Sequence, residues 1–175
     1  MEEQVRHSLS QMFRIGTVTS TDPSSHTVRV VFPEDGNVVS YDLPVLVRNS
    51  YDNCDYNMPD VNEDVVCLFR SDGLEDGVVI GSFYTGEVKP PANSQDIREV
   101  KFKDGTTVTY DRASHELDVV IADTHIHADR QKVDVTTKVS VNVTTDGTIN
   151  LDAKGNINIS SSANVNITGS KVNIN

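Results

Sequence analysis

The chain has 175 residues, a mass of 19.2 kDa and a formal net charge of −11 at pH 7. This length suits one ordinary domain or a small domain with an appendage, and the acidic balance argues against a nucleic-acid-binding protein, which normally carries a basic surface. Two cysteines, Cys54 and Cys67, are too few for a disulfide framework. The sequence has neither a signal peptide at residues 1–12 nor a run of the ~18 apolar residues that a membrane helix needs. We therefore expect a folded soluble protein that is made inside a cell.

The composition changes along the chain. All ten Phe and Tyr lie at or before Tyr110, and the first 124 residues carry a charge of −12. From His125 onward the chain carries +1 and is rich in Asn, Thr, Ser, Val and Ile. A core of aromatic and large aliphatic side chains can therefore form only in the front part, and the tail needs another source of stability.

The first 90 residues follow a strand pattern. Residues 1–12 form an N-terminal arm, as a short helix or a flexible segment. Short runs rich in Val, Ile, Phe and Tyr follow, with turn residues between them: FRIGTVTSTD, HTVRVVF, VVSYDLPVLV, DVVCLF and GVVIGSF. Five strands in so short a stretch predict a small antiparallel barrel or sandwich over 13–90, with Cys67 as a small buried residue.

A linker and a hairpin follow over 91–116. The segment KPPANS begins the linker, and VKFK and TTVTY then flank Asp104-Gly105, a dipeptide typical of a tight hairpin turn. We therefore expect a two-stranded transition between the barrel and the tail.

The tail, residues 117–175, is an internal repeat of eight residues. Steps of eight from Leu117 give LDVVIADT, HIHADRQK, VDVTTKVS, VNVTTDGT, INLDAKGN and INISSSAN, and then the shorter VNITGSK and VNIN. Outside the His segment, positions one and three are always Val, Ile or Leu, and position two is Asp or Asn. Each octad is therefore a short strand with one apolar side.

A single chain of this length cannot bury such a stripe. A solenoid made by one chain usually needs more residues per coil, and about fifty residues supply few coils. Three chains wrapped about a shared axis would bury every stripe and leave Asn and Thr in water. We therefore expect a homotrimer with an intertwined β-helix, or β-prism, whose folding is coupled to association.

The order of these segments resembles the baseplate assembly protein V group, the central spike proteins of contractile phage tails and related bacteriocin-like particles. The resemblance runs from Phe13 to the end, and YNMPDVNEDVVCLF and the octads are its most specific parts. Asn62 stands where relatives usually have Gly. The resemblance implies that 13–90 is an OB-fold barrel and that 117–175 is a trimeric β-helical needle.

The same resemblance implies a mechanical function and a set of partners. The needle would pierce the target-cell envelope when the sheath contracts, in a virion or tailocin baseplate that is assembled in the bacterial cytoplasm. A hub protein would contact the N-terminal side, and the blunt C-terminal end predicts a separate tip protein. No phosphate loop, catalytic triad or paired catalytic carboxylates stand out, and the junction is too short for the lysozyme domain of some relatives, so we expect no enzyme activity. A trimeric receptor-binding fibre or adhesin is the alternative function.

His125 and His127 are the candidate metal ligands. They occupy octad positions one and three, so both imidazoles are predicted to face the threefold axis, where three chains bring six together. Unpaired, each buried imidazole would cost roughly 1–3 kcal/mol, and a metal ion removes that cost. Six nitrogen donors suit iron or nickel better than zinc, which prefers four tetrahedral ligands. Similar spike proteins hold iron in a His-x-His cage near the tip, which implies one iron ion per trimer, although 48 residues follow the pair here.

Two other interpretations of the His pair stay open at this point. A local bulge could turn Ile126 and Ala128 to the aliphatic side and leave the histidines in solvent. The segment IADTHIHAD is also similar to the first metal-binding strand of metal-dependent amidohydrolases. Those enzymes need further His and Asp ligands on later strands of a large barrel, and no His follows His127.

Overall fold

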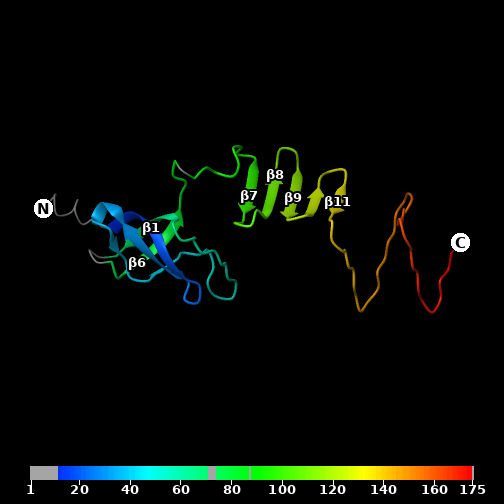
Figure 1. Ribbon diagram of the computed structural model, residues 1–175, viewed down its shortest axis with the longest axis horizontal. Helices are drawn as coiled ribbons and strands as arrows, with labels where there is room; N and C mark the ends of the chain where they lie inside the picture. Colours follow the sequence, from blue (N-terminus) through cyan, green and yellow to red (C-terminus); the bar gives the residue numbers. More distant parts are fainter. Residues whose placement is uncertain (1–11, 71–73, 87, 175) are drawn as a thin grey trace.

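The computed structural model describes residues 12–70, 74–86 and 88–174, and the regular secondary structure within them is almost entirely β-strand (Figure 1). A short 3-10 helix, η1 (Pro33–Asp35), lies among the strands. The strands in chain order are β1 (Phe13–Asp22), β2 (Thr27–Phe32), β3 (Val38–Val39), β4 (Leu43–Pro44), β5 (Asp64–Phe69), β6 (Gly77–Ser82), β7 (Ile97–Lys101), β8 (Thr107–Asp111), β9 (Glu116–Ile121), β10 (Thr124–Ala128) and β11 (Val133–Thr136). They form two antiparallel sheets, which confirms the predicted all-β class. The predicted arm over 1–12 lies outside the described residues except for Met12.

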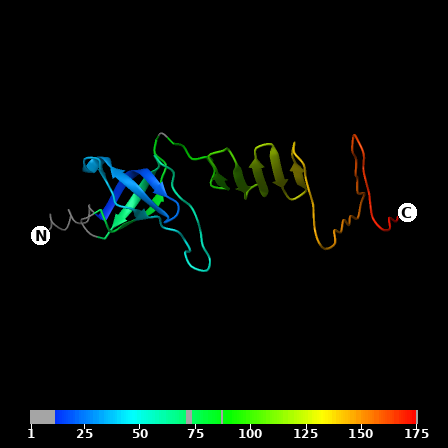
Figure 2. The ribbon, with the colours of Figure 1, turned by 60° about the horizontal axis from the view of Figure 1, so that its bottom comes forward.

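The first sheet has the order β3-β2-β1-β5-β6, and β4 also pairs with β2. Its two sides approach each other, because Val45, just after β4, forms a bridge with Val79 of β6. The Leu46 N–H donates to the Val79 carbonyl oxygen at 2.8 Å and strengthens this junction. The sheet therefore wraps around its own interior, and Figure 2 shows it as a body separate from the row of strands β7 to β11.

The interior of the first sheet is an apolar core. Strand β5 alternates buried and less buried side chains, as a strand with one side on a core must. The rings of Phe32 and Phe69 meet edge to face, with centroids 5.8 Å apart. Cys67 is fully buried, as predicted. The buried apolar side chains are Val18, Val28, Val30, Phe32, Leu43, Val65, Cys67, Phe69 and Val79.

The predicted strand VVSYDLPVLV is divided into β3 and β4, and Ser40 supplies the physical reason. Its backbone N–H donates to the Val30 carbonyl oxygen at 2.8 Å, while its buried hydroxyl accepts from the Val30 N–H at 3.0 Å and donates to the Tyr41 carbonyl oxygen at 2.7 Å. A side chain thus takes the place of a backbone group in the ladder. Regular pairing stops there and resumes at β4.

The second sheet is a meander with the order β11-β10-β9-β8-β7. The predicted hairpin around Asp104-Gly105 is confirmed, because β7 pairs with β8 from Ile97–Asp111 to Lys101–Thr107. Gly105 has a φ of 89°, in the left-handed region that glycine enters at low cost. The first octads, which form β9 to β11, continue the same sheet as this hairpin.

The remaining octads form no strand among residues 137–174, which leave the sheet as an extended segment (Figure 1). The large aliphatic side chains there are exposed, from 46% for Val172 to 84% for Ile174. An extended strand needs a neighbour for its backbone N–H and C=O groups and for its apolar side chains. Within the described part of one chain, this segment has no such neighbour.

Two leucines three residues apart test the core of the first sheet. Leu43 is fully buried, whereas Leu46 is 60% exposed. We expect Leu43→Ala to lower the free energy of unfolding by about 2–5 kcal/mol, because it leaves a cavity, and Leu46→Ala to change it by about 0.5 kcal/mol or less. Urea denaturation followed by circular dichroism measures both, and equal losses would contradict this core.

Candidate functional site

The pairing register divides the second sheet into two chemically different faces. Directly paired residues of neighbouring strands point to the same side of a sheet. On one side lie two rows that cross all five strands. The first row is Val100, Val108, Val119, Ile126 and Val135, and the second is Arg98, Tyr110, Leu117, Ala128 and Val133. We call the nine uncharged members of these rows the apolar face.

Much of the apolar face is open to water in the single chain. Seven of its nine side chains are large and between 36% and 72% exposed, with Ile126 the least and Val133 the most exposed of them. A continuous apolar surface that is exposed to this extent is unusual for a monomeric protein and is typical of an interaction surface.

The opposite side, the polar face, carries both histidines. Its two rows also cross all five strands. They are Glu99, Thr109, Asp118, His127 and Asp134, and Lys101, Thr107, Val120, His125 and Thr136. Among the ten residues of these two rows, Val120 is the only aliphatic one.

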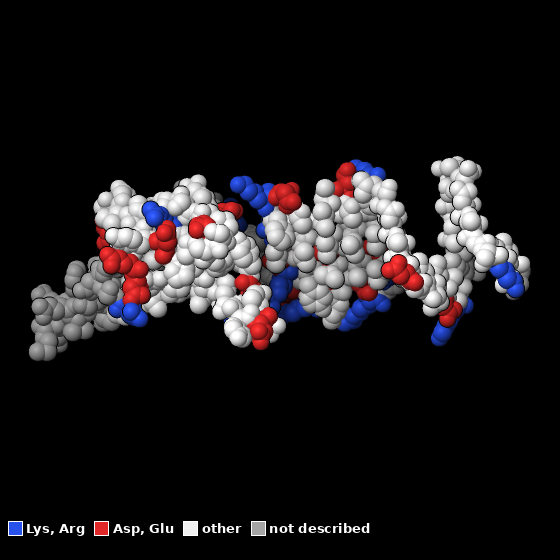
Figure 3. Space-filling view, turned by 90° about the horizontal axis from the view of Figure 1, so that it is seen from below, with Lys and Arg blue, Asp and Glu red and all other residues white. Residues whose placement is uncertain are grey.

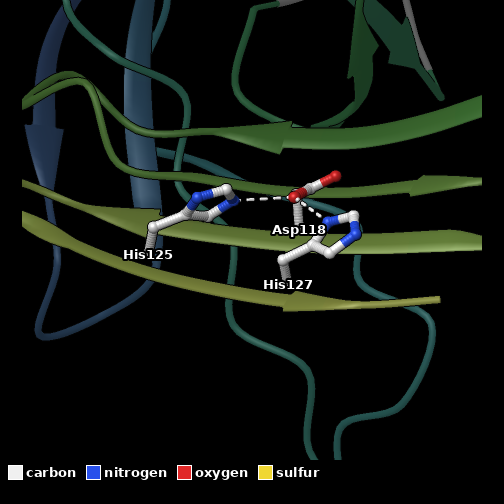
Figure 4. A group of neighbouring side chains, drawn as sticks. All are labelled: Asp118, His125 and His127. Carbon is white, nitrogen blue, oxygen red and sulfur yellow. Dashed lines mark hydrogen bonds and ion pairs between the residues drawn. The ribbon is translucent and has the colours of Figure 1, made fainter. Parts of the chain in front are cut away.

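On the polar face, Asp118 of β9 and the two histidines of β10 form a cluster (Figure 4). The Asp118 Oδ1 atom lies 2.7 Å from His125 Nε2 and 2.8 Å from His127 Nδ1. The other ring nitrogen of His127, Nε2, lies 3.3 Å from Asp129 Oδ2. The His127 side chain is 18% exposed, while those of His125 and Asp118 are 49% and 32% exposed. The three groups are therefore held together by the sheet and stay open to solvent on one side.

The electrostatics of the cluster follow from these contacts. The hydrogen bond to Asp118, helped by the one to Asp129, raises the pKa of His127 above its usual 6.5. Hydrogen bonds from His127 and His125 lower the pKa of Asp118. The backbone N–H groups of Gln131 and Lys132 lower the pKa of Asp129. Two carboxylates thus face a pair of imidazoles, an arrangement that holds protons or a metal cation.

The predicted histidines do lie on one side of their strand, but not on the predicted side. Leu117 and Val133 both pair with Ala128, so the aliphatic octad positions share a face with Ile126 and Ala128, and His125 and His127 point the other way. The alternative interpretation, a local bulge that turns Ile126 and Ala128 to the aliphatic side, gives the correct orientation of these two side chains. Its bulge is absent, because strand pairing is continuous through β10. The cause is the antiparallel register, which pairs odd-numbered with even-numbered residues across the β9–β10 and β10–β11 turns.

Sequence reasoning missed Asp118 and Asp129. Steps of eight align Asp118 with Ile126, whereas the tight turn at Ala122 and Asp123 places Asp118 directly opposite His127. The short connection at Ala122 and Asp123 is the feature from which the position of Asp118 could have been predicted, because a two-residue loop fixes an antiparallel register.

Charged side chains of both signs are spread over the two sheets, while the extended tail carries few (Figure 3). Among residues 12–70, 74–86 and 88–174, no helix has the length and apolar character needed to cross a membrane.

Compared with protein-family models and with curated protein sequences, the chain matches none.

The titration of His127 tests the cluster. In protein freed of metal with a chelator, we expect the pKa of His127 to lie above 6.5 and to fall in Asp118→Asn, because the main hydrogen-bond acceptor loses its charge. The contribution of this group to hairpin stability is then full below the ordinary histidine pKa and is lost as the pH rises through the raised value. Histidine NMR titration measures it, and an identical pKa in the variant would contradict the cluster.

Proposed function

We propose that three copies of this chain form the central spike of a contractile-tail baseplate, in a phage or a phage-tail-like bacteriocin. The apolar face is the observation that carries the proposal. It is a continuous surface of two rows across five strands that one chain leaves in water. Burial of apolar area is the main favourable contribution to association, so this surface favours a partner of matching shape.

Other copies of the same chain are the simplest such partner, because each copy carries the same apolar face. Three five-stranded sheets that turn their apolar faces to a common axis make a closed three-sided prism, with the polar face outside. The exposed octads of residues 137–174 continue this logic, because three strands that wind around one another give each a neighbour for its backbone groups. A closed cross-section also leaves no free sheet edge along the shaft.

In this proposal, each part of the chain has a mechanical task. The self-wrapped first sheet is an OB-fold barrel that attaches to the baseplate hub. The prism and the intertwined β-helix form a stiff needle that a separate tip protein completes and that crosses the target-cell envelope on sheath contraction. The support is the sequence resemblance together with the order of a core-bearing sheet, a sheet with one apolar face, and an apolar repeat without partners.

The iron ion implied by the resemblance does not have a place on the axis of the proposed prism. A cage on the threefold axis would need the six imidazoles of three chains to meet there. In the proposed prism the apolar face fills the axis at the level of β10, and His125 and His127 point outward with Asp118. Iron is one of the ions that imidazole and carboxylate ligands suit, but the proposed prism does not place it on the axis.

Neighbouring residues on opposite faces of β11 test the association. Val135 belongs to the apolar face and Thr136 to the polar face. We expect light scattering to give the mass of a trimer for the unchanged chain and for Thr136→Lys. Val135→Lys should reduce the trimer at least tenfold in its association constant, because three ammonium groups would be buried on one axis. A monomeric unchanged chain, or equal behaviour of the two variants, would contradict the prism.

Particle-level experiments test the function itself. If contractile particles are purified from the source cells, antibodies against the first sheet should label the baseplate end. Particles assembled with Val135→Lys should lack the spike or fail to breach target cells, and Thr136→Lys should serve as the control. Labelling along the sheath or at distal fibres would instead assign the chain to another part of the particle.

A further inference from the structure

We propose that Asp118, His125 and His127 of a single chain bind one first-row transition-metal dication on the polar face of the second sheet. The ion would be bound once per chain, and not once per trimer. The site consists of one chain's residues, so it goes beyond the spike proposal and does not depend on it.

The donor atoms already converge. One ligand atom from each of the three residues lies within 4.8 Å of the others, and Asp118 Oδ1 is 2.7–2.8 Å from a nitrogen of each imidazole. Metal–nitrogen bonds of about 2.0–2.1 Å separate neighbouring ligand atoms by roughly 2.9–3.4 Å in octahedral or tetrahedral geometry. The two oxygen–nitrogen distances therefore need to lengthen by only a few tenths of an ångström. The two imidazoles already offer nitrogens within 4.8 Å of each other, so side-chain rotation can complete the site without a change in the strand pairing.

The position of Asp129 is a second, independent observation that favours a metal site. Its Oδ1 atom accepts the backbone N–H groups of Gln131 and Lys132 at 2.6 and 2.8 Å, which leaves Oδ2 facing His127 Nε2 at 3.3 Å. This contact favours a hydrogen on Nε2 and directs the Nδ1 lone pair of His127 toward Asp118. A carboxylate that fixes the tautomer of a ligating histidine is a regular companion of metal sites.

The charges of the cluster also call for a cation. Both nitrogens of His127 face carboxylate oxygens, and a neutral imidazole has one N–H, so it can donate to only one of them. A dication placed between the histidines and Asp118 balances the charges of Asp118 and Asp129 together. It also removes the need for two imidazoles to compete for one oxygen atom.

The ligand types define the class of ion. Two of the three donors are imidazole nitrogens, which suit zinc, nickel, cobalt or iron(II), whereas magnesium and calcium prefer oxygen ligands. Because His125 and Asp118 are partly exposed, water can complete the coordination shell. The ion would join β9 to β10 across the hairpin, next to the strand from which the extended tail departs.

The test uses the full chain, stripped with a chelator and then titrated with zinc chloride in a calorimeter. We expect one zinc ion per chain and no comparable heat with magnesium chloride. His125→Ala, His127→Ala and Asp118→Asn should each weaken binding by at least tenfold, and Asp129→Asn by about 10–100-fold through the lost support of His127. The matched control is His115→Asn, which removes an exposed histidine of the same sheet's β8–β9 turn and should leave binding unchanged.

Several outcomes would overturn the proposal. They are no zinc binding, one ion per three chains, or affinity that is indifferent to His125→Ala and Asp118→Asn. Light scattering on the same samples separates this result from that of the spike proposal. A monomer that binds one ion per chain keeps the metal site and contradicts the spike, whereas a metal-free trimer does the reverse.

Discussion

The antiparallel register of β7 to β11 is the constraint on which the rest of the structure depends. Side chains alternate along a strand, so a shift of one residue would move every side chain of that strand to the other face. The connection at Ala122 and Asp123 is only two residues long and pairs Ile121 with Thr124. That turn aligns Ile126 with Val119, and it leaves His127 opposite Asp118. The apolar rows and the histidine cluster are thus two consequences of one register.

The three parts of the chain differ in how they are stabilised. The first sheet buries its own core, in which Phe32 and Phe69 are in direct contact. The second sheet pairs each strand with its neighbours in the meander but leaves an apolar face in water. The octads after β11 have neither strand pairing nor buried aliphatic side chains in the described residues. In the proposed trimer, the distal parts would therefore depend on association more than the first sheet does, and their stability would vary with protein concentration.

Local pattern is enough to predict much of the fold. The runs FRIGTVTSTD and DVVCLF coincide with β1 and β5, because alternation of apolar residues between turn signals is a property of the segment itself. The division of the run over 38–47 was not predictable, since it depends on a hydrogen bond between Ser40 and Val30, ten residues apart. The His pair could be found from its spacing. Its orientation and its partner Asp118 depend on pairing between strands, which a repeat counted in steps of eight does not contain.

The positions of His125 and His127 on the polar face have an energetic rationale. On the apolar face, each imidazole would lose its hydrogen-bond partners in an associated state, at a cost of roughly 1–3 kcal/mol per group. On the polar face the same two rings share Asp118 and remain partly hydrated. In the proposed trimer, the segment HIHA therefore places Ile126 and Ala128 on the face that would be buried. It leaves both imidazoles on the polar face, where they are available for the proposed metal ion. Because the two faces have no residues in common, the proposed association and the proposed ion binding can be tested one at a time by single substitutions in the same strand.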